Sequence, residues 1–277
     1  METAESINNN KNEIESSIIR ILLIEDDPND ALLMRRMLER DNPRRFYIKH
    51  CDRLSHGIEI LNSQNFDVML LDLELPDSFG MGTIEWARAH AVQLPIIVLT
   101  GMEDERIAME ALKAGAQDYL VKSRTEKTDV VKSILMALEH KQIRQELRKS
   151  ERRLELAIEA AELGLWDWDI LADKIILDKR ILRFLGISEN ENGRPLDSLL
   201  KFIDPDDLGQ AAASFHDHIQ GQSRLFEIEA RVLDNSDEWR WVLILGKVVE
   251  CDKDGKSLRA VGIFRDITHR KTAEKTK

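Results

Sequence analysis

Short apolar runs alternate with helix-like stretches over the first half of the chain. Three of the runs, ILLI, VMLL and IIVL, are apolar at every position, which is typical of strands covered on both faces in a parallel sheet. The predicted strands are Arg20–Ile24, Phe46–His50, Val68–Leu71, Pro95–Leu99 and Tyr119–Val121. Helical spacings between them complete five βα units, so residues 18–138 are predicted to form a doubly wound α/β domain with a five-stranded parallel sheet.

Polar side chains follow the ends of four of these strands. Glu25, Asp26 and Asp27 follow the first strand, Asp72 the third, Thr100 the fourth and Lys122 the fifth. Ligands of open α/β sheets bind beyond the carboxyl ends of the strands, so we expect these side chains to converge. Because carboxylates at close range repel one another, a divalent cation that prefers hard oxygen ligands, Mg²⁺, would stabilise the group.

This set of residues fits phosphoryl transfer. Asp72 could attack a phosphoryl group and carry it as an acyl phosphate. Lys122 and the Thr100 hydroxyl would then balance the charge on the transferring oxygens. Each residue alone has an ordinary explanation as a turn residue, a solvated lysine or a loop hydroxyl. Their joint placement at four strand ends favours the functional interpretation.

Four segments resemble the signature motifs of the response-regulator receiver family, which has a flavodoxin-like fold. They are ILLIEDDPND, VMLLDLELPDSFG, PIIVLTG and GAQDYLVKS, within about residues 18–138. The resemblance implies that Glu25 and Asp26 hold Mg²⁺ and that Asp72 is the phosphoacceptor. It also implies that the backbone carbonyl of Glu74 completes the metal shell. The phosphodonor would be a cognate sensor histidine kinase or a phosphotransfer protein.

The same resemblance assigns the remaining polar residues. Thr100 and Tyr119 match the coupled switch pair of the family, and Lys122 matches the lysine that pairs with the phosphoryl group. Asp27 lies one position beyond the acidic pair and directly before Pro28. It is therefore interpreted as the cap of a first helix that runs through Arg40.

Two residues depart from the family pattern or modify it. Ser123 stands where the family usually has a proline in a cis bond, and a non-proline cis bond costs about 2.5–4 kcal/mol. A trans bond is therefore expected, and the loop that bears Lys122 is free to differ from the family. Glu74 places a carboxylate two residues after the phosphoacceptor. It is expected to tune the lifetime of the acyl phosphate, in a direction that the sequence leaves open.

A long helix is predicted from Thr128 to about Leu163, a stretch without proline or glycine. A heptad seam runs along it at His140, Ile143, Leu147, Ser150, Leu154, Ala157 and Ala161. The seam predicts a coiled-coil linker over residues 139–153 and a homodimer through this helix. Its two polar core positions are equally compatible with a plain surface helix. His140 is interpreted as a structural residue, not as a phosphoacceptor.

The second half of the chain has the pattern of an antiparallel sheet with helices. Strands are predicted around Trp166–Ile170, at Lys174–Leu177, at Phe226–Val232, at Trp239–Leu245 and at Leu258–Thr268, with a helical region between the second and the third. GLWDWDI, FIDPDDL, EWRWV and AVGIFRDITHRK resemble the PAS/PAC family. The resemblance implies an α+β domain with a five-stranded antiparallel sheet over residues 154–271, followed by a tail at 272–277.

No fixed cofactor is predicted for this second domain. Covalent flavin binding in the family uses a helical cysteine, and no cysteine lies between Trp166 and Val249. Haem would need a helical histidine, and the candidates, His216 and His218, are interpreted as structural residues. Packing in the core or in a dimer is the expected role of the tryptophans, with a pocket lining as the alternative; they are Trp166, Trp168, Trp239 and Trp241.

Composition narrows the class of protein. The net charge of −11 over 277 residues disfavours nucleic-acid binding through a broad basic surface. The two cysteines, Cys51 and Cys251, are too far apart in sequence to form a metal motif, as expected in a reducing compartment. No apolar run reaches the roughly 20 residues of a membrane span. Residues 1–17 lack the apolar core of a signal peptide and are predicted to form a disordered tail, so a cytoplasmic protein without a membrane partner is expected.

These observations predict a two-component response regulator. Phosphorylation of Asp72 would switch the receiver, and the linker helix would relay the change to a PAS sensing or dimerisation domain. No output catalytic domain is recognised, so output is expected by contact with a downstream protein. Two alternatives remain: the regulatory part of a larger histidine kinase or diguanylate cyclase, and an aspartyl-nucleophile phosphatase.

Overall fold

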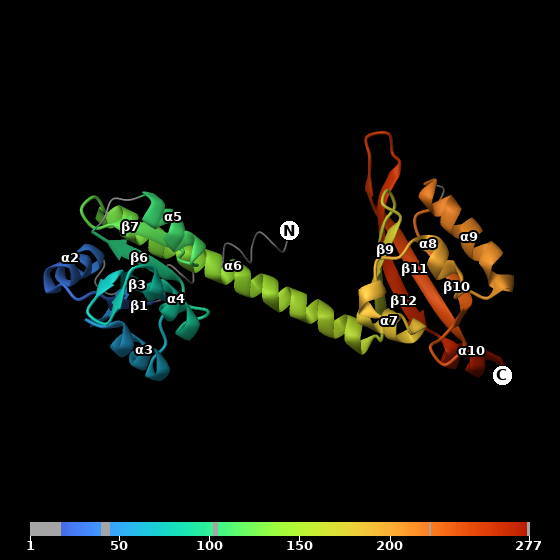
Figure 1. Ribbon diagram of the computed structural model, residues 1–277, viewed down its shortest axis with the longest axis horizontal. Helices are drawn as coiled ribbons and strands as arrows, with labels where there is room; N and C mark the ends of the chain where they lie inside the picture. Colours follow the sequence, from blue (N-terminus) through green and yellow to red (C-terminus); the bar gives the residue numbers. More distant parts are fainter. Residues whose placement is uncertain (1–17, 40–44, 102–104, 222, 276–277) are drawn as a thin grey trace. The chain divides into compact units, whose positions relative to one another are not determined.

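The chain folds into two compact units that divide between Lys149 and Ser150. The computed structural model describes residues 18–39, 45–101, 105–221 and 223–275 (Figure 1). The predicted tail at residues 1–17 lies outside the described part of the chain, as do the last two residues.

The first unit is built on a five-stranded parallel sheet in the order β2-β1-β3-β6-β7. Its strands are β1 (Ile19–Ile24), β2 (Phe46–Cys51), β3 (Val68–Asp72), β6 (Ile96–Thr100) and β7 (Asp118–Val121). Each predicted strand lies within one residue of the observed one at both ends. The buried residues of β1 and β3 are apolar up to Asp72, because helices cover both faces of the sheet; Arg20, near the start of β1, is exposed.

Five helices provide that cover, namely α2 (Pro28–Glu39), α3 (Leu54–Ser63), α4 (Met81–His90), α5 (Glu105–Lys113) and the first part of α6 (Lys127–Ala160). α2 and α6 bury Met34 and Ile134 against one face of the sheet. α3, α4 and α5 bury Leu54, Ile84 and Ala111 against the other. The predicted doubly wound fold is confirmed. The predicted end of the first helix, Arg40, lies outside the described residues.

A short hairpin, β4 (Glu74–Leu75) with β5 (Ser78–Phe79), follows β3 directly. Its turn residue Asp77 accepts hydrogen bonds from the backbone N–H groups of Leu54 and Ser55, at 3.0 and 2.9 Å. These are unpaired donors at the start of α3, where Arg53 makes no side-chain cap. The hairpin was not predicted, and Asp77 ties it to α3.

α6 is a continuous helix of 34 residues, about 50 Å long at 1.5 Å per residue. It begins one residue before the predicted start and ends at Ala160, three residues before the predicted end. Val130 and Ile134 are fully buried, whereas Ile143, Leu147 and Leu154 are each more than half exposed. The predicted seam is thus an exposed apolar stripe, and dimerisation along it stays a prediction.

The second unit contains a five-stranded antiparallel sheet in the order β10-β11-β12-β8-β9. Its strands are β8 (Gly164–Asp169), β9 (Lys174–Leu177), β10 (Phe226–Leu233), β11 (Trp239–Cys251) and β12 (Ser257–Asp266). Its helices are α7 (Lys179–Leu185), the 3₁₀ turn η1 (Glu189–Glu191), α8 (Leu196–Leu200), α9 (Pro205–Ile219) and α10 (Thr268–Lys275). The predicted α+β domain is confirmed. Asp204 caps α9 by accepting a hydrogen bond from the N–H of Asp206, with Pro205 in the first turn.

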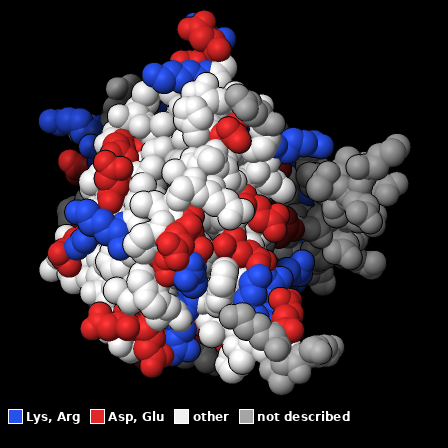
Figure 2. All heavy atoms as spheres, turned by 90° about the vertical axis from the view of Figure 1, so that its right-hand side faces the viewer, with Lys and Arg blue, Asp and Glu red and all other residues white. Residues whose placement is uncertain are grey.

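Acidic and basic side chains are interspersed among uncharged ones on the face shown in Figure 2. Cys51 is buried at the end of β2, and Cys251 is exposed at the end of β11. In the described part of the chain, no helix is both long enough and apolar enough to cross a membrane.

Candidate functional site

Three carboxylates meet at the carboxyl edge of the parallel sheet. β1 pairs in parallel with β3, with Ile24 opposite Leu71, so Glu25 and Asp72 emerge side by side. One carboxylate oxygen from each of Glu25, Asp26 and Asp72 lies within 4.8 Å of the other two. Glu25 and Asp72 are buried, at 1% and 4% exposure, and Asp26 is exposed. The sheet register alone therefore brings the predicted acidic residues together.

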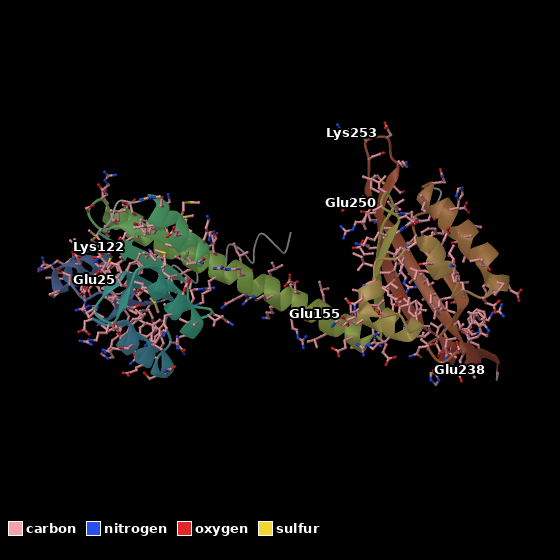
Figure 3. All side chains as sticks on the ribbon, viewed as in Figure 1. Glu25, Lys122, Glu155, Glu238, Glu250 and Lys253 are labelled. Carbon is pink, nitrogen blue, oxygen red and sulfur yellow. The ribbon has the colours of Figure 1, made fainter. Side chains whose placement is uncertain are left out.

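The Lys122 ammonium contacts two of these acids, Glu25 and Asp72. Figure 3 labels Lys122 and Glu25 close to each other in the first unit. Lys122 follows β7, and its backbone N–H donates to the Thr100 carbonyl at 2.8 Å. Its Nζ lies 2.6 Å from Glu25 Oε2, 2.9 Å from Asp72 Oδ2 and 3.0 Å from Asp30 Oδ2. Asp30 belongs to the first turn of α2 and was not predicted as a site residue.

Burial and charge perturb both partners of the closest pair. Burial, reinforced by the charge of Asp72, raises the pKa of Glu25 to about 7 although Lys122 opposes the shift. Burial disfavours the Lys122 ammonium, but hydrogen bonds to Glu25, Asp72 and Asp30 outweigh it and raise the Lys122 pKa. Several carboxylates thus share one ammonium. This donor set of carboxylate oxygens fits a small hard divalent cation such as Mg²⁺.

Asp27 has a separate, structural role. Its Oδ1 accepts hydrogen bonds from the backbone N–H groups of Asn29, at 2.7 Å, and Asp30, at 3.3 Å. These bonds lower the pKa of Asp27. The interpretation of Asp27 as the helix cap is confirmed, and the cap fixes the turn of α2 from which Asp30 reaches Lys122.

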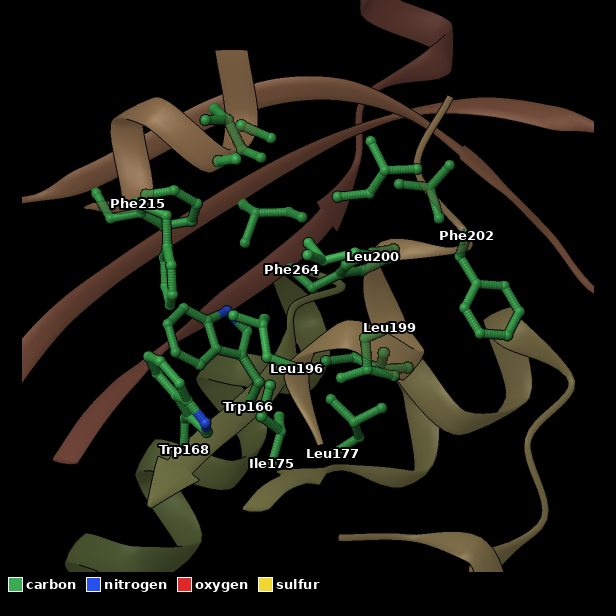
Figure 4. Close-up of a pocket in the computed structure, with 18 of the residues that line it drawn as sticks. Trp166, Trp168, Ile175, Leu177, Leu196, Leu199, Leu200, Phe202, Phe215 and Phe264 are labelled. Carbon is green, nitrogen blue, oxygen red and sulfur yellow. The ribbon is translucent and has the colours of Figure 1, made fainter. Parts of the chain in front are cut away.

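A second candidate site is an apolar cavity of about 380 Å³ in the second unit (Figure 4). Trp166 and Trp168 line it from β8, and Phe215 lines it from α9. The Trp166 indole N–H donates to the Ile263 carbonyl at 3.2 Å, and that of Trp168 donates to Asp173 Oδ1 at 3.3 Å. Both indole N–H groups are therefore engaged within the protein, and these rings present carbon to the cavity.

The tryptophans of β8 have both of the roles that the sequence left open. Trp168 is buried in the core and Trp166 packs against it, and both rings also line the cavity. The Trp166 indole lies against Gly246 of β11 and Gly262 of β12, where a side chain would collide with it. Trp239 is 47% exposed, so it belongs to neither cavity nor core. Trp241 contacts the cationic groups of Arg231 and Lys271 over its ring.

The two candidate haem histidines differ in position. His216 lines the cavity. His218 is buried, and its Nε2 accepts a hydrogen bond from the Val248 N–H at 3.0 Å while Nδ1 lies 3.0 Å from the Ser223 carbonyl oxygen. Because the Val248 N–H can only donate and the Ser223 carbonyl can only accept, His218 carries its proton on Nδ1 and is a structural residue.

Comparison with known families agrees with both halves of the fold. Residues 21–135 match the family model of the response regulator receiver domain, and residues 174–264 match that of the PAS fold. This chain contains a receiver domain and a PAS domain. β8, which carries Trp166 and Trp168, precedes the matched PAS segment but pairs with β12 and β9 in the same sheet.

Among similar proteins is the cell cycle response regulator CtrA of Brucella ovis, which is 35% identical over 104 residues. That match covers 38% of this chain and 44% of CtrA, so the chain spans less than half of the curated relatives it matches. A sensory box histidine kinase/response regulator from Burkholderia thailandensis E264 is 27% identical, with a TM-score of 0.39 over 45% of this chain and 91% of that one. A receiver domain protein from Clostridium thermocellum is 26% identical, with a TM-score of 0.41 over 46% and 98%.

The predicted switch pair of the receiver domain lies on neighbouring strands. Thr100 is fully buried at the end of β6, and Tyr119 is half-buried in β7. Val98 pairs with Tyr119 and Thr100 with Val121, so Thr100 and Tyr119 point to the same face of the sheet, two positions apart. This placement is compatible with a coupled pair and leaves their switching role a prediction.

The two departures from the receiver pattern have clear structural outcomes. The described residues contain no cis peptide bond, so the Lys122–Ser123 bond is trans, as expected. Lys122 reaches Asp72 in this trans loop. Glu74 is exposed in β4, and its backbone N–H donates to Asp72 Oδ1 at 3.4 Å. Glu74 is thus an exposed neighbour of Asp72, and its effect on the acyl phosphate stays a prediction.

Proposed function

We propose that this chain is a two-component response regulator whose receiver domain accepts a phosphoryl group on Asp72. The observation that carries the proposal is the buried Asp72 carboxylate, which lies beside an acidic pair and 2.9 Å from a lysine ammonium. We assign residues 18–138 to the receiver domain, 139–153 to the linker and 154–271 to the PAS domain.

The chemistry at Asp72 follows from these neighbours. An Asp72 oxygen attacks the phosphorus of a phosphohistidine or of a small phosphodonor, and the leaving nitrogen or oxygen keeps the electron pair of the broken bond. Lys122 neutralises charge on the transferred phosphoryl oxygens, and the Thr100 hydroxyl donates to one of them. Glu25, Asp26, Asp72 and the Glu74 carbonyl would hold Mg²⁺, which supplies further neutralisation of those oxygens.

Phosphorylation with a small donor tests this proposal. The purified chain is incubated with acetyl phosphate and Mg²⁺, and bound phosphate is counted by intact mass. Wild type should gain one acid-stable, base-labile phosphoryl group, and Asp72→Ala none. Asp67→Asn is the matched control, because Asp67 accepts a hydrogen bond from the Arg20 N–H directly before β3, at the opposite end of the same strand. Phosphorylation of Asp72→Ala would contradict the assignment, and turnover of phosphate monoesters beyond one equivalent would favour the phosphatase alternative.

We further propose that α6 relays the switch to the PAS domain and that output occurs by contact with a downstream protein. Support comes from the continuity of α6 between the two sequence regions that match the two families. Hydrogen exchange along residues 139–160 should change when Asp72 is phosphorylated. Exchange that is identical in the two states would contradict a relay through this helix.

The cavity supports a sensory role for the PAS domain. Its aromatic and aliphatic lining favours a small apolar molecule, since a charged ligand would lose its hydration without compensation. Native mass spectrometry of the purified chain would detect such an adduct. An ultraviolet–visible spectrum distinguishes it from a coloured cofactor: a Soret or flavin band would overturn the prediction of no fixed cofactor.

A further inference from the structure

Glu25, Asp26 and Asp72 form an acidic triad. Lys122 has one carboxylate partner that does not belong to this triad. Two of its ion pairs, at 2.6 and 2.9 Å, are with Glu25 and Asp72, the buried members of the triad. The third, at 3.0 Å, is with Asp30 on α2, whose side chain is 40% exposed. The Lys122 side chain is only 16% exposed, so water has little access to these three ion pairs. Asp30 therefore competes with the triad for the same ammonium.

That competition matters for metal binding. A divalent cation in the triad needs the Glu25 and Asp72 carboxylates that Lys122 now contacts. The ammonium and the metal repel each other, so whatever draws Lys122 away from these two carboxylates favours the metal. Asp30 is the one carboxylate that contacts Lys122 from outside the triad among the described residues.

We propose that Asp30 is a positioning residue of the phosphoacceptor site: it keeps the Lys122 ammonium at α2 when a divalent cation displaces that ammonium from Glu25 and Asp72. This inference rests on the proposed function and names a further residue of the same site. Asp30 acts through Lys122 and needs no contact with the metal or the phosphoryl group. The Asp27 cap supports it, because Asp27 accepts the Asp30 N–H and fixes the turn that carries the carboxylate.

The simpler interpretation is that Asp30 is an ordinary acid in the first turn of a helix, stabilised by the helix dipole. Such a residue would affect metal binding only through its net charge. Asp52 provides the comparison, because it is an exposed acid that directly follows β2, at the same edge of the sheet. Neutralising Asp52 removes the same charge without touching an ion pair of Lys122.

The test is the Mg²⁺ affinity of the full chain, measured by calorimetric titration for wild type, Asp30→Asn, Asp30→Glu and Asp52→Asn. A buffer of about 0.15 M ionic strength limits the reach of exposed charges to roughly 8 Å. Asp30→Asn should weaken Mg²⁺ binding about 10-fold, the lower end of the loss seen when a residue that orients metal ligands is removed. Asp52→Asn should change it less than about 2-fold, and Asp30→Glu should restore most of the loss.

A double-mutant cycle with Lys122→Gln decides whether Asp30 acts through the lysine. In that background, Asp30→Asn should have no larger effect than Asp52→Asn. Equal effects of Asp30→Asn and Asp52→Asn in the wild-type background would overturn the inference and leave the proposed function intact. An undiminished effect of Asp30→Asn without Lys122 would also overturn it. Wild type that binds no Mg²⁺ would overturn the proposed function together with the inference.

Discussion

Glu25 makes the metal-free receiver domain less stable above neutral pH, and Glu25→Gln should reverse this. Burial raises the pKa of Glu25 from its usual 4.5 to about 7. The folded protein therefore holds this proton more tightly than the unfolded chain. The protonated group stabilises the fold below about pH 4.5, and that stabilisation is lost as the pH rises through 7.

The size of the effect follows from the shift of about 2.5 pH units, the difference between 7 and 4.5. At 1.36 kcal/mol per unit, the ionised carboxylate costs the metal-free fold roughly 3 kcal/mol at pH 8. Glutamine has nearly the same shape and no charge, and Lys122 keeps Asp72 and Asp30 as partners. In EDTA, Glu25→Gln should therefore be more stable than wild type by up to about 3 kcal/mol at pH 8, and about equally stable at pH 4.5.

Hydrogen exchange of the β3 amides measures this stability in the receiver domain alone, because exchange resolves each part of the chain. Variant and wild type are compared at the same pH, so intrinsic exchange rates cancel. Mg²⁺ should close most of this gap: at about 100 times its dissociation constant it adds about 2.7 kcal/mol to wild type, and little to Glu25→Gln. A Glu25→Gln chain that is less stable than wild type in EDTA at pH 8 would refute the reasoning. It would mean that the pairing with Lys122 outweighs the cost of burying the charge.

Three further changes have defined outcomes. Gly246→Ala places a Cβ closer to the Trp166 indole carbons than van der Waals contact allows. It should destabilise the PAS domain by about 1–3 kcal/mol, measured by hydrogen exchange of the β11 amides, and addition of Trp166→Leu should relieve most of the loss. Asp77→Ala removes the acceptor at the start of α3 and should cost the receiver domain about 1 kcal/mol in thermal unfolding, with Asp77→Asn intermediate; an unchanged midpoint would argue against the cap. Leu147→Lys should shift the sedimentation of a dimer held by α6 towards monomer, and a wild-type chain that is already monomeric would contradict the predicted coiled coil.

The sequence was most informative where one periodicity decides the structure. Apolar runs located the strands of the parallel sheet within one residue, and polar residues at their ends located Glu25, Asp72 and Lys122. The β4–β5 hairpin escaped prediction because two-residue strands leave no periodic signal. The short helices α7 and α8 were covered only by one broad helical region, since five to seven residues hold too few turns to show a spacing.

Asp30 and the PAS cavity escaped for different physical reasons. In the sequence, Asp30 is an ordinary acid in the first turn of a helix. Its contact with Lys122, 92 positions away in the chain, depends on how far the two side chains extend. Its position about one helical turn after Glu25 and Asp26 could have indicated a role in the site, but many solvated acids lie at the same spacing. For the PAS cavity, the alternation of apolar and acidic residues placed Trp166 and Trp168 on one face of a strand. Whether that face packs into a filled core or lines a cavity depends on the volumes of side chains from several other elements, and the pattern of one strand does not contain these volumes.

The two thiols differ in exposure, so the native chain can be labelled at a single cysteine. Burial raises the pKa of Cys51 to about 11, so at neutral pH it stays protonated and shielded, while Cys251 is exposed at the β11–β12 hairpin. Since the thiolate is the reactive form, a maleimide should attach to Cys251 and spare Cys51. A spin label introduced there without any substitution would give a distance between two copies in an assembled dimer. A monomer would give no such distance. The native Cys251 thiol therefore allows association of the chain to be measured without a mutation.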